Sequence, residues 1–278
     1  MAIITLTTDF GEKDHFAGAI KGAIYSEMPE VKIVDISHSV SPFSIPEAAY
    51  IIQSAYSSFP EGTIHVIGID SEINPENKHI AVKLDGHYFV CANNGIMSMI
   101  CAEIAPEQIV EINIHDKIVS SFPVLDVFVK VATHLARGGT LGVIGKAINT
   151  IKPITNIHPF VNEDRTQIIG SIIYIDNYGN VVTNIRKSFF EKVQKGRSFE
   201  ISARNYKFKT IHKNYSDIVN FDIPEEKRHD EGRGVVVFNS SNYLEIALYK
   251  SNTETVGSAS TLMGLKQMDT VTININKV

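Results

Sequence analysis

The sequence predicts an α/β N-terminal domain with an open sheet, followed by a smaller, mostly antiparallel β-domain that is either a barrel or a sandwich. In the first half, apolar runs of strand length alternate with segments of helical period, an order typical of an open sheet with helices on its faces. After about residue 150, short strands are separated by turn-type residues instead. We therefore predict domains at 1–152 and 167–278, joined by a linker at 153–166.

The first domain opens with an apolar, β-branched run at 2–8, which stops at Asp9 and predicts a buried strand that delivers a loop. Residues 16–28 carry apolar side chains at helical spacing and end before a proline. The segment 46–59 has similar spacing, with a proline and a glutamate in its first turn. The other elements expected here are strands at 32–36, 63–69, 79–84 and 87–92 and a helix at 127–137 that two glycines end.

The second domain is expected to consist mainly of short strands with turn-type residues between them. These strands are predicted at 168–175, 181–185, 198–201, 206–211, 234–238, 243–248 and 271–275. Short helices are predicted at 187–193 and near 255–262.

Composition excludes several classes of function. The net charge of −5 argues against a nucleic-acid partner, because such proteins need a basic face to displace counterions. Cys91 and Cys101 lack metal-ligand spacing and indicate buried thiols in a reducing compartment, so we expect no metal. No apolar run approaches the roughly 20 residues that span a bilayer, and the N-terminus does not resemble a signal peptide. We therefore expect a cytoplasmic protein with no membrane contact.

The first candidate site is Thr7-Thr8-Asp9-Phe10-Gly11, followed by Asp14. A carboxylate at the C-terminal end of the first strand of an open α/β sheet lies where ligands usually bind. There it can accept hydrogen bonds from both hydroxyls of a ribose. Alternatively, Asp9 caps a helix that begins near residue 14. Position alone leaves both roles open.

The second candidate is Asp176-Asn177-Tyr178-Gly179-Asn180, between two apolar strands. As a hairpin turn it needs no function, because asparagine and glycine suit turn conformations. In the functional interpretation, Asp176 pairs with a ligand ammonium and the Asn180 amide with a ligand carboxylate. Turn statistics favour the structural interpretation.

The third candidate is the polar loop that runs from Asp70 to His79. A single histidine is more often structural than catalytic, so His79 alone indicates little. The chain also lacks the GxSxG, P-loop, GxGxxG and HExxH motifs, which removes the usual evidence for several large enzyme classes.

Short motifs follow one another along nearly the whole chain: Thr7-Thr8-Asp9-Phe10-Gly11, Val34-Asp35-Ile36-Ser37-His38, Phe59-Pro60-Glu61-Gly62-Thr63, Asn93-Asn94-Gly95, Ala132-Thr133-His134-Leu135-Ala136, Asp176-Asn177-Tyr178-Gly179-Asn180 and Asn239-Ser240-Ser241. Each is weak alone, but in this order they resemble the S-adenosylmethionine hydroxide adenosyltransferase family, a relative of the S-adenosylmethionine-dependent fluorinase and chlorinase. The resemblance implies a C-terminal β-barrel and a homotrimer whose ligand lies between the N-domain of one subunit and the C-domain of a neighbour. No cofactor is implied, since S-adenosylmethionine is the substrate or ligand.

The resemblance also implies roles for residues of this chain. Asp9 would hold the ribose hydroxyls and Phe43 would pack beside the ligand. Asp176 and Asn180 would take the methionine end, with Tyr178 near the adenine. The remaining implied binding residues are Asp14, Asn94, Phe122, Tyr215 and Ser240, with backbone groups of Leu248 to Lys250 at the adenine edge.

The implied reaction is an in-line displacement at the ribose C5′, with methionine leaving from its sulfonium. Hydrolytic members use Asp, Arg and His for it. Asp70 matches the aspartate, but the arginine position falls on Asn77 and the histidine position on Pro123. Lys78 or His79 would then substitute beside Asp70. An S-adenosylmethionine hydrolase is our first interpretation, a binding protein with little or no turnover the second, and an enzyme for a related nucleoside the third.

Overall fold

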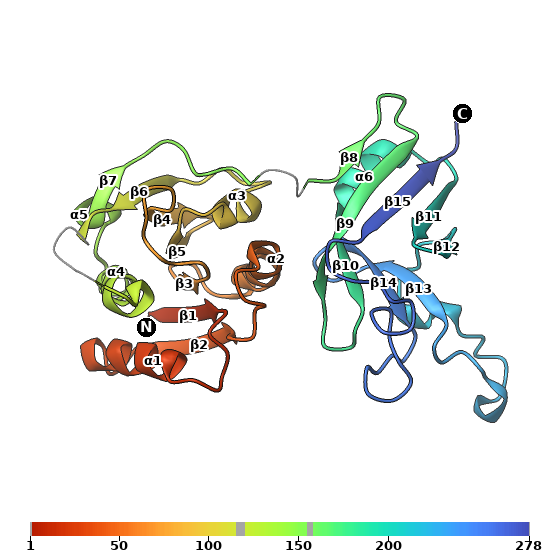
Figure 1. The fold of residues 1–278 in the computed structure, drawn as a ribbon, viewed down its shortest axis with the longest axis horizontal. Helices are drawn as coiled ribbons and strands as arrows, with labels where there is room; N and C mark the ends of the chain where they lie inside the picture. The colour runs from red at the N-terminus through yellow and green to blue at the C-terminus, as the bar shows by residue number, and fades with distance from the viewer. Residues whose placement is uncertain (1, 115–119, 155–157, 278) are drawn as a thin grey trace. The chain divides into compact units, whose positions relative to one another are not determined.

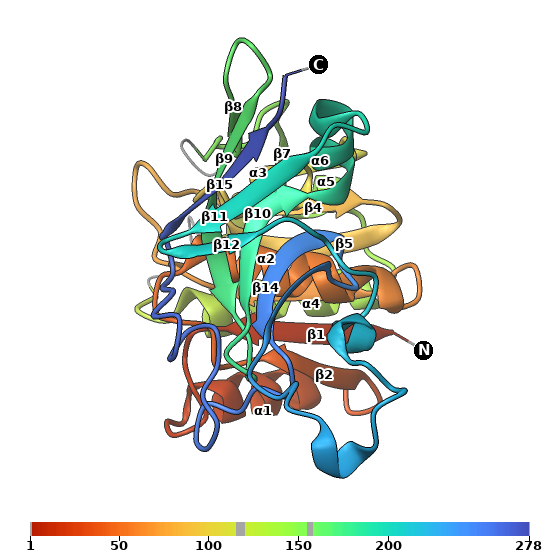
Figure 2. The ribbon, with the colours of Figure 1, turned by 90° about the vertical axis from the view of Figure 1, so that its right-hand side faces the viewer.

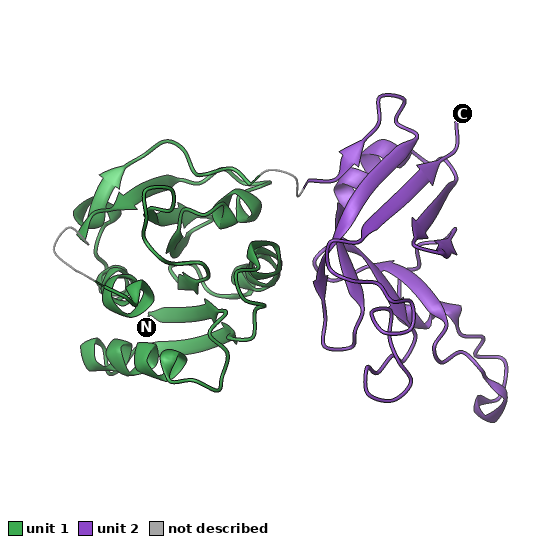
Figure 3. Cartoon of the chain, in the orientation of Figure 1, with its two compact units in different colours: residues 1–154 green, residues 155–278 purple. Residues whose placement is uncertain are grey.

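The computed structural model describes residues 2–114, 120–154 and 158–277. The chain divides into two compact units, residues 1–154 and 155–278 (Figures 1 and 3). Each unit has its own hydrophobic core and is described by itself. Residues 155–157 of the predicted linker lie outside the described part of the chain.

Unit 1 is built on one seven-stranded sheet in the order β2-β1-β3-β5-β4-β6-β7. Four neighbouring strands run parallel to one another and the other three antiparallel to their neighbours. The parallel strands are β2 (Lys32–Ser37), β1 (Ile3–Thr8), β3 (Ile64–Gly68) and β5 (His87–Ala92). The others are β4 (His79–Leu84), β6 (Gln108–Ile112) and β7 (Gly145–Ala147). The carboxyl ends of the parallel strands therefore share one edge, where open α/β sheets bind ligands.

Helices cover both faces of this sheet (Figure 1). Apolar side chains of α1 (Phe16–Glu27), α4 (Val129–Ala136) and α5 (Leu141–Ile144) share a core cluster with Ile4 and Leu6 of β1. Those of α2 (Ile45–Ala55) and α3 (Ile96–Ile100) form a second cluster with β3, β4 and β5. A 3-10 turn, Tyr56–Ser58, extends α2, and a π-helical turn, Val124–Phe128, precedes α4. Strands β1 and β3 are buried along nearly their whole length, as expected of parallel strands that are covered on both faces.

Unit 2 is an antiparallel sheet whose main path is β12-β11-β15-β9-β10-β14-β13, with β8 pairing β9. Figure 2 shows these strands curving around one another. Just beyond β12, His212 forms a parallel bridge with Val237 of β13, so the sheet closes nearly into a barrel. The strands are β8 (Phe160–Val161), β9 (Gln167–Ile175), β10 (Val181–Arg186), β11 (Phe199–Ala203), β12 (Tyr206–Phe208), β13 (Gly234–Phe238), β14 (Tyr243–Leu248) and β15 (Thr270–Ile275). Helix α6 (Lys187–Gln194) packs Phe190 and Val193 into the barrel core.

The predicted fold class is confirmed, with an open sheet followed by an antiparallel β-barrel. The sequence analysis missed α3, α5, β6, β7 and β8, which are short. The helix predicted near 255–262 is wrong, because the segment forms turns. There the Ser258 hydroxyl and the Thr261 hydroxyl each accept a hydrogen bond from the other residue's backbone N–H. Such side-chain bonds compete with a helix.

No helix among residues 2–114, 120–154 and 158–277 is both long enough and apolar enough to cross a membrane.

Candidate functional site

Asp9 lies directly beyond β1, at the sheet edge where the parallel strands end. Its Oδ2 accepts a hydrogen bond from the backbone N–H of Phe43 at 2.8 Å. Helix α1 begins only at Phe16, and the residue at its N-cap is His15, so Asp9 does not cap it. Partial burial raises the pKa of Asp9; the Phe43 N–H opposes this, and the charge of Asp70 adds to it. A second carboxylate therefore shares this edge with Asp9.

Two non-glycine residues at this edge adopt left-handed backbone conformations. Phe43 has φ 61° and Asp70 has φ 42°. The Phe43 ring is 72% exposed, although a large aromatic side chain usually packs inside. Backbone strain of this kind persists only where surrounding contacts impose it, and it concentrates at functional sites. Because the Phe43 side chain is exposed and its backbone N–H bonds Asp9, its ring can pack against a ligand beside Asp9.

Asn77 and Asn94 hold the Asp70 turn. The Asn94 amide donates to the carbonyl oxygens of Ile69 at 2.9 Å and Asp70 at 3.4 Å. The Asn77 Nδ2 donates to the Asp70 carboxylate at 3.3 Å. Asn94 is buried and its Oδ1 accepts the N–H of Ile96, so its side chain braces the turn. The two amides thus fix both the backbone and the carboxylate of Asp70.

His79 and Lys78 end this loop and have different surroundings. His79 is 0% exposed, its Nε2 lies 2.8 Å from the carbonyl oxygen of Ser71, and its ring meets Phe128 edge-on. These contacts favour a role for His79 in holding the loop and place its ring away from solvent. Lys78 is exposed, and its carbonyl accepts the N–H of Asn93.

A second lysine, Lys152, reaches the same loop from a distant part of the chain. Its Nζ donates to the Asn77 Oδ1 at 3.0 Å, and its backbone N–H donates to the Asn93 side chain at 2.8 Å. The sequence analysis missed Lys152, which lies 75 residues beyond Asn77 at the predicted domain boundary. No motif there distinguishes it from a solvated lysine.

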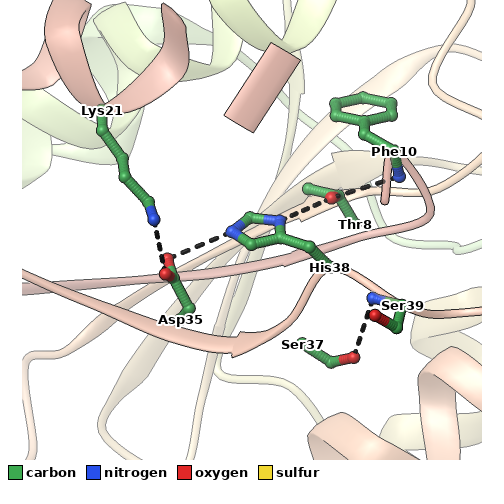
Figure 4. Close-up of polar contacts among 7 residues, drawn as sticks. All are labelled: Thr8, Phe10, Lys21, Asp35, Ser37, His38 and Ser39. Carbon is green, nitrogen blue, oxygen red and sulfur yellow. Dashed lines mark hydrogen bonds and ion pairs between the residues drawn. The ribbon is translucent and has the colours of Figure 1, made fainter. Parts of the chain in front are cut away.

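A chain of polar contacts anchors the loop beyond β1 to β2 (Figure 4). The Thr8 hydroxyl lies 2.7 Å from the Nδ1 of the buried His38. The His38 Nε2 lies 3.1 Å from Asp35, which also pairs with Lys21 of α1. Burial would raise the pKa of Asp35, but the contacts with Lys21 and His38 outweigh it and lower the pKa. The residue that precedes Asp9 is therefore tied to both β2 and α1.

An aromatic cluster lies beside this loop. Phe122 meets Phe10 and Phe16 edge-on, with ring centroids 5.5 and 5.2 Å apart. Pro123, which follows, is buried and is the N-cap residue of the π-helical turn. Asp14 is exposed. The predicted residues Asp9, Phe43, Asp70 and Asn94 thus occur at one sheet edge, while Phe122 belongs to the apolar wall near Phe10.

In unit 2, Asp176 organises the turn between β9 and β10. Its Oδ1 accepts the N–H groups of Tyr178 and Asn180, and its Oδ2 accepts the Asn180 side-chain amide. The Asn180 Oδ1 accepts the Ser251 hydroxyl at 3.2 Å. The Tyr178 ring is exposed. The segment therefore forms the predicted hairpin turn, and the Asp176 carboxylate is held in place by three hydrogen bonds within it.

Glu245 of β14 is a buried acid that the sequence analysis missed. It is 3% exposed and accepts hydrogen bonds from the Tyr215 hydroxyl at 2.6 Å and the Asn239 amide at 3.0 Å. Burial raises the pKa of Glu245; these two bonds oppose the rise, and the charge of Asp176 adds to it. Tyr215 and Asp176, both predicted site residues, therefore lie near one buried carboxylate. A charge inside the apolar strand 243–248 was the available signal.

Among the other predicted residues of unit 2, several backbone groups already form hydrogen bonds within the unit. Ser240 is exposed in the turn that Asn239 stabilises. The backbone N–H and carbonyl of Tyr249 bond Arg233 and Gly232, and the Leu248 carbonyl accepts the N–H of Ser251. Lys250 lines a cavity of about 300 Å³ and pairs with Glu231.

Within the described part of the chain, no three His, Cys, Asp or Glu side chains form a group that could hold a metal ion.

Comparison with known proteins agrees with this architecture. Residues 4–145 match the family model of the SAM hydroxide adenosyltransferase N-terminal domain, and residues 170–272 match that of the C-terminal domain. The chain belongs to the S-adenosylmethionine hydroxide adenosyltransferase family.

Named relatives fall into two groups. A protein of Methanocaldococcus jannaschii named (R)-S-adenosyl-L-methionine hydrolase is 28% identical over 98% of this chain and 95% of its own length. A protein of Actinoplanes sp. named fluorinase is 23% identical over 88% of this chain and 90% of its own length. The crystal structure of an uncharacterized conserved protein from Thermotoga maritima is 27% identical, with a TM-score of 0.80 over 99% of this chain and 100% of that one.

Membership in the adenosyltransferase family makes two positions informative. Asn77 stands where the resemblance places an arginine, and it keeps a hydrogen bond to Asp70. Pro123 stands where it places a histidine, and neighbouring Val124 has its methyl group 3.1 Å from the position of a Cβ added to Gly68. Pro123 therefore lies near the end of β3 and the Asp70 turn.

The raised pKa of Asp9 can be measured in the free protein. We expect Asp70→Asn to lower the pKa of Asp9, because it removes a like charge, but only in part, because burial is the larger cause. Carbon-detected NMR titration of the Asp9 carboxyl tests this. The control is Asp85→Asn, an exposed site in the β4–β5 turn. An unchanged Asp9 titration in Asp70→Asn would contradict the placement of the two carboxylates.

The Asp176 turn requires glycine at Gly179, where φ is +76° and an added Cβ would lie 2.1 Å from the Ser258 hydroxyl oxygen. Gly196 is a matched control, with φ +77° and nothing within 4 Å. We expect Gly196→Ala to cost about 1–2 kcal/mol from backbone strain alone. Gly179→Ala should cost about 1–3 kcal/mol more from overpacking. Hydrogen exchange of amides in β9 and β10 measures both, and equal losses would refute the packing argument.

Proposed function

We propose that this chain is an S-adenosylmethionine hydrolase that releases adenosine and methionine. The observation that carries the proposal is the fixed pair of carboxylates, Asp9 and Asp70, at the ligand-binding edge of the sheet, with the backbone of Asp70 held in a left-handed conformation. Relatives named (R)-S-adenosyl-L-methionine hydrolase over most of the chain support the same reaction.

The proposed reaction is an in-line displacement. The oxygen of a water attacks C5′ of the ribose as the C5′–sulfur bond breaks. The bonding electrons pass to the positively charged sulfur, so methionine leaves as a neutral thioether. Asp70 orients the water and takes its proton. Because the leaving group is already activated, the protein must chiefly supply alignment and a poorly solvated nucleophile.

Asp9 serves binding in this scheme. Its carboxylate accepts hydrogen bonds from the two ribose hydroxyls, while the Phe43 N–H keeps one carboxylate oxygen in place. The exposed Phe43 ring packs beside the nucleoside. In unit 2 of a neighbouring subunit, Asp176 and Asn180 receive the methionine end and Tyr178 lies near the adenine. Tyr215 and Ser240 line the same pocket, with backbone groups of Leu248 to Lys250 at the adenine edge. The homotrimer and the cytoplasmic location stay predictions.

A binding protein with little or no turnover is the second candidate. The observation that favours it is the pair Asn77 and Pro123, neither of which can transfer a proton in the way that histidine does. The two candidates share the Asp9 half of the site and differ only in whether Asp70 activates water.

Turnover separates them. We expect the pure protein to release adenosine and methionine in equal amounts from S-adenosylmethionine, measured by chromatography. Asp70→Asn should lower kcat by about 10²-fold or more, the scale of a lost general base. The control Asp164→Asn, at an exposed residue of unit 2, should leave kcat unchanged. Tight binding without product from the unmodified protein would establish the second candidate.

The role of Asp9 is tested by affinity. Asp9→Ala should weaken nucleoside binding by about 1.5–3 kcal/mol, the scale of charge-assisted hydrogen bonds. Because burial raises the pKa of Asp9, we expect affinity to fall on acidification at a higher pH than an ordinary aspartate would give. Asp9→Asn should remove that pH dependence. Calorimetry with adenosine from neutral to acidic pH measures both, and unchanged affinity in Asp9→Ala would exclude ribose binding.

A further inference from the structure

A three-residue polar chain connects a cation to the Asp70 carboxylate. The Lys152 ammonium donates to the Asn77 Oδ1 at 3.0 Å, and the Asn77 Nδ2 donates to the Asp70 Oδ2 at 3.3 Å. Lys152 has only donors and an ionised Asp70 has only acceptors, so the amide has one orientation that satisfies both neighbours. The oxygen must face the lysine and the nitrogen must face the aspartate.

In this orientation, the hydrogen bonds from Lys152 to Asn77 and from Asn77 to Asp70 are polarised in the same direction. The ammonium draws electron density toward the amide oxygen, which makes the Nδ2–H group a stronger donor to the carboxylate. Hydrogen bonds in such chains polarise one another, and the effect grows where solvent is partly excluded. Among the described contacts, Lys152 therefore reaches the Asp70 carboxylate through Asn77 and not directly.

The backbone around Lys152 is held against the same loops. The Lys152 N–H donates to the Asn93 Oδ1 at 2.8 Å, and the Ile154 N–H donates to the Ser98 hydroxyl at 3.1 Å. The Ile154 side chain also packs over Gly95, where an added Cβ would lie 3.2 Å from it. These contacts fix the base of the lysine side chain, so the ammonium starts from a defined position.

Lys152 fits this role better than the lysine next to Asn77. Lys78 follows Asn77 directly, but its side chain is exposed and its described contact is a backbone one. Lys152 has a further contact with the Glu76 carbonyl at 3.5 Å, which holds it over the loop. The distant lysine, and not the adjacent one, completes the polar chain.

We propose that Lys152 is a positioning residue for the proposed hydrolysis, which acts through Asn77 to hold the Asp70 carboxylate in the orientation that receives the proton of the attacking water. This inference rests on the proposed function, because it concerns the step in which Asp70 receives the proton of the water. It predicts an effect of Lys152 on the chemical step and none on ligand affinity.

The test compares Lys152→Met, Lys152→Arg and the control Lys146→Met, an exposed lysine of β7 in the same unit. We expect Lys152→Met to lower kcat for adenosine release by about 10-fold, the scale of one lost charge-assisted hydrogen bond. KM should stay within about twofold, because transition-state stabilisation alone is lost. Lys152→Arg should restore most of kcat, and Lys146→Met should behave as the unmodified protein.

A bypass variant excludes a merely structural role. Asn77→Arg puts a guanidinium directly against Asp70, where it supplies the charge without Lys152. In that background, Lys152→Met should cost less than about twofold in kcat, a non-additivity expected of residues in one network. An equal loss in both backgrounds, or an unchanged kcat in Lys152→Met, would overturn the inference while leaving the hydrolase proposal intact. Absence of adenosine release from the unmodified protein would instead overturn the hydrolase proposal, and this inference with it.

Discussion

The parallel pairing of β1 with β2 and β3 is the constraint on which the candidate site of unit 1 depends. These strands, with β5, end at one edge, so Asp9, His38, Asp70 and Asn94 come together although they are far apart in the sequence. Their backbone groups leave the ladder at this edge and need other partners. The side chains of Asp9, Asn94 and Thr8 supply several of them.

The same edge brings together two carboxylates whose interaction is unfavourable. Asp9 and Asp70 repel, and partial burial makes the charge of Asp9 less favourable. The Phe43 N–H and the Asn77 amide offset part of this cost, each by a hydrogen bond to one carboxylate. Left-handed backbone at Phe43 and Asp70 adds local strain that the surrounding fold must support. The site therefore depends both on these two hydrogen bonds and on the surrounding fold that holds the strained backbone.

Sequence patterns predicted the elements that depend on residues close together in the chain. The buried run before Asp9 and the turn residues around Asp176 predicted a strand end and a hairpin, and both are present. Lys152 and Glu245 escaped notice, because each depends on a partner far along the chain. The sequence also did not show that the His79 side chain is buried against Phe128. The false helix near 255–262 arose because periodicity does not register hydroxyl groups that bond the backbone.

The position of Lys152 has a consequence for how the protein is divided. Unit 1 extends to residue 154, whereas the family model of the N-terminal domain stops at residue 145. A fragment that ended at residue 145 would retain strands β1 to β6, the first residue of β7, and the carboxylates of Asp9 and Asp70. It would lack Lys152, whose ammonium bonds the Asn77 side chain that bonds Asp70, and the Lys152 backbone N–H that bonds the Asn93 side chain. The family model therefore ends before Lys152, whereas the compact unit that holds the Asp70 loop includes it.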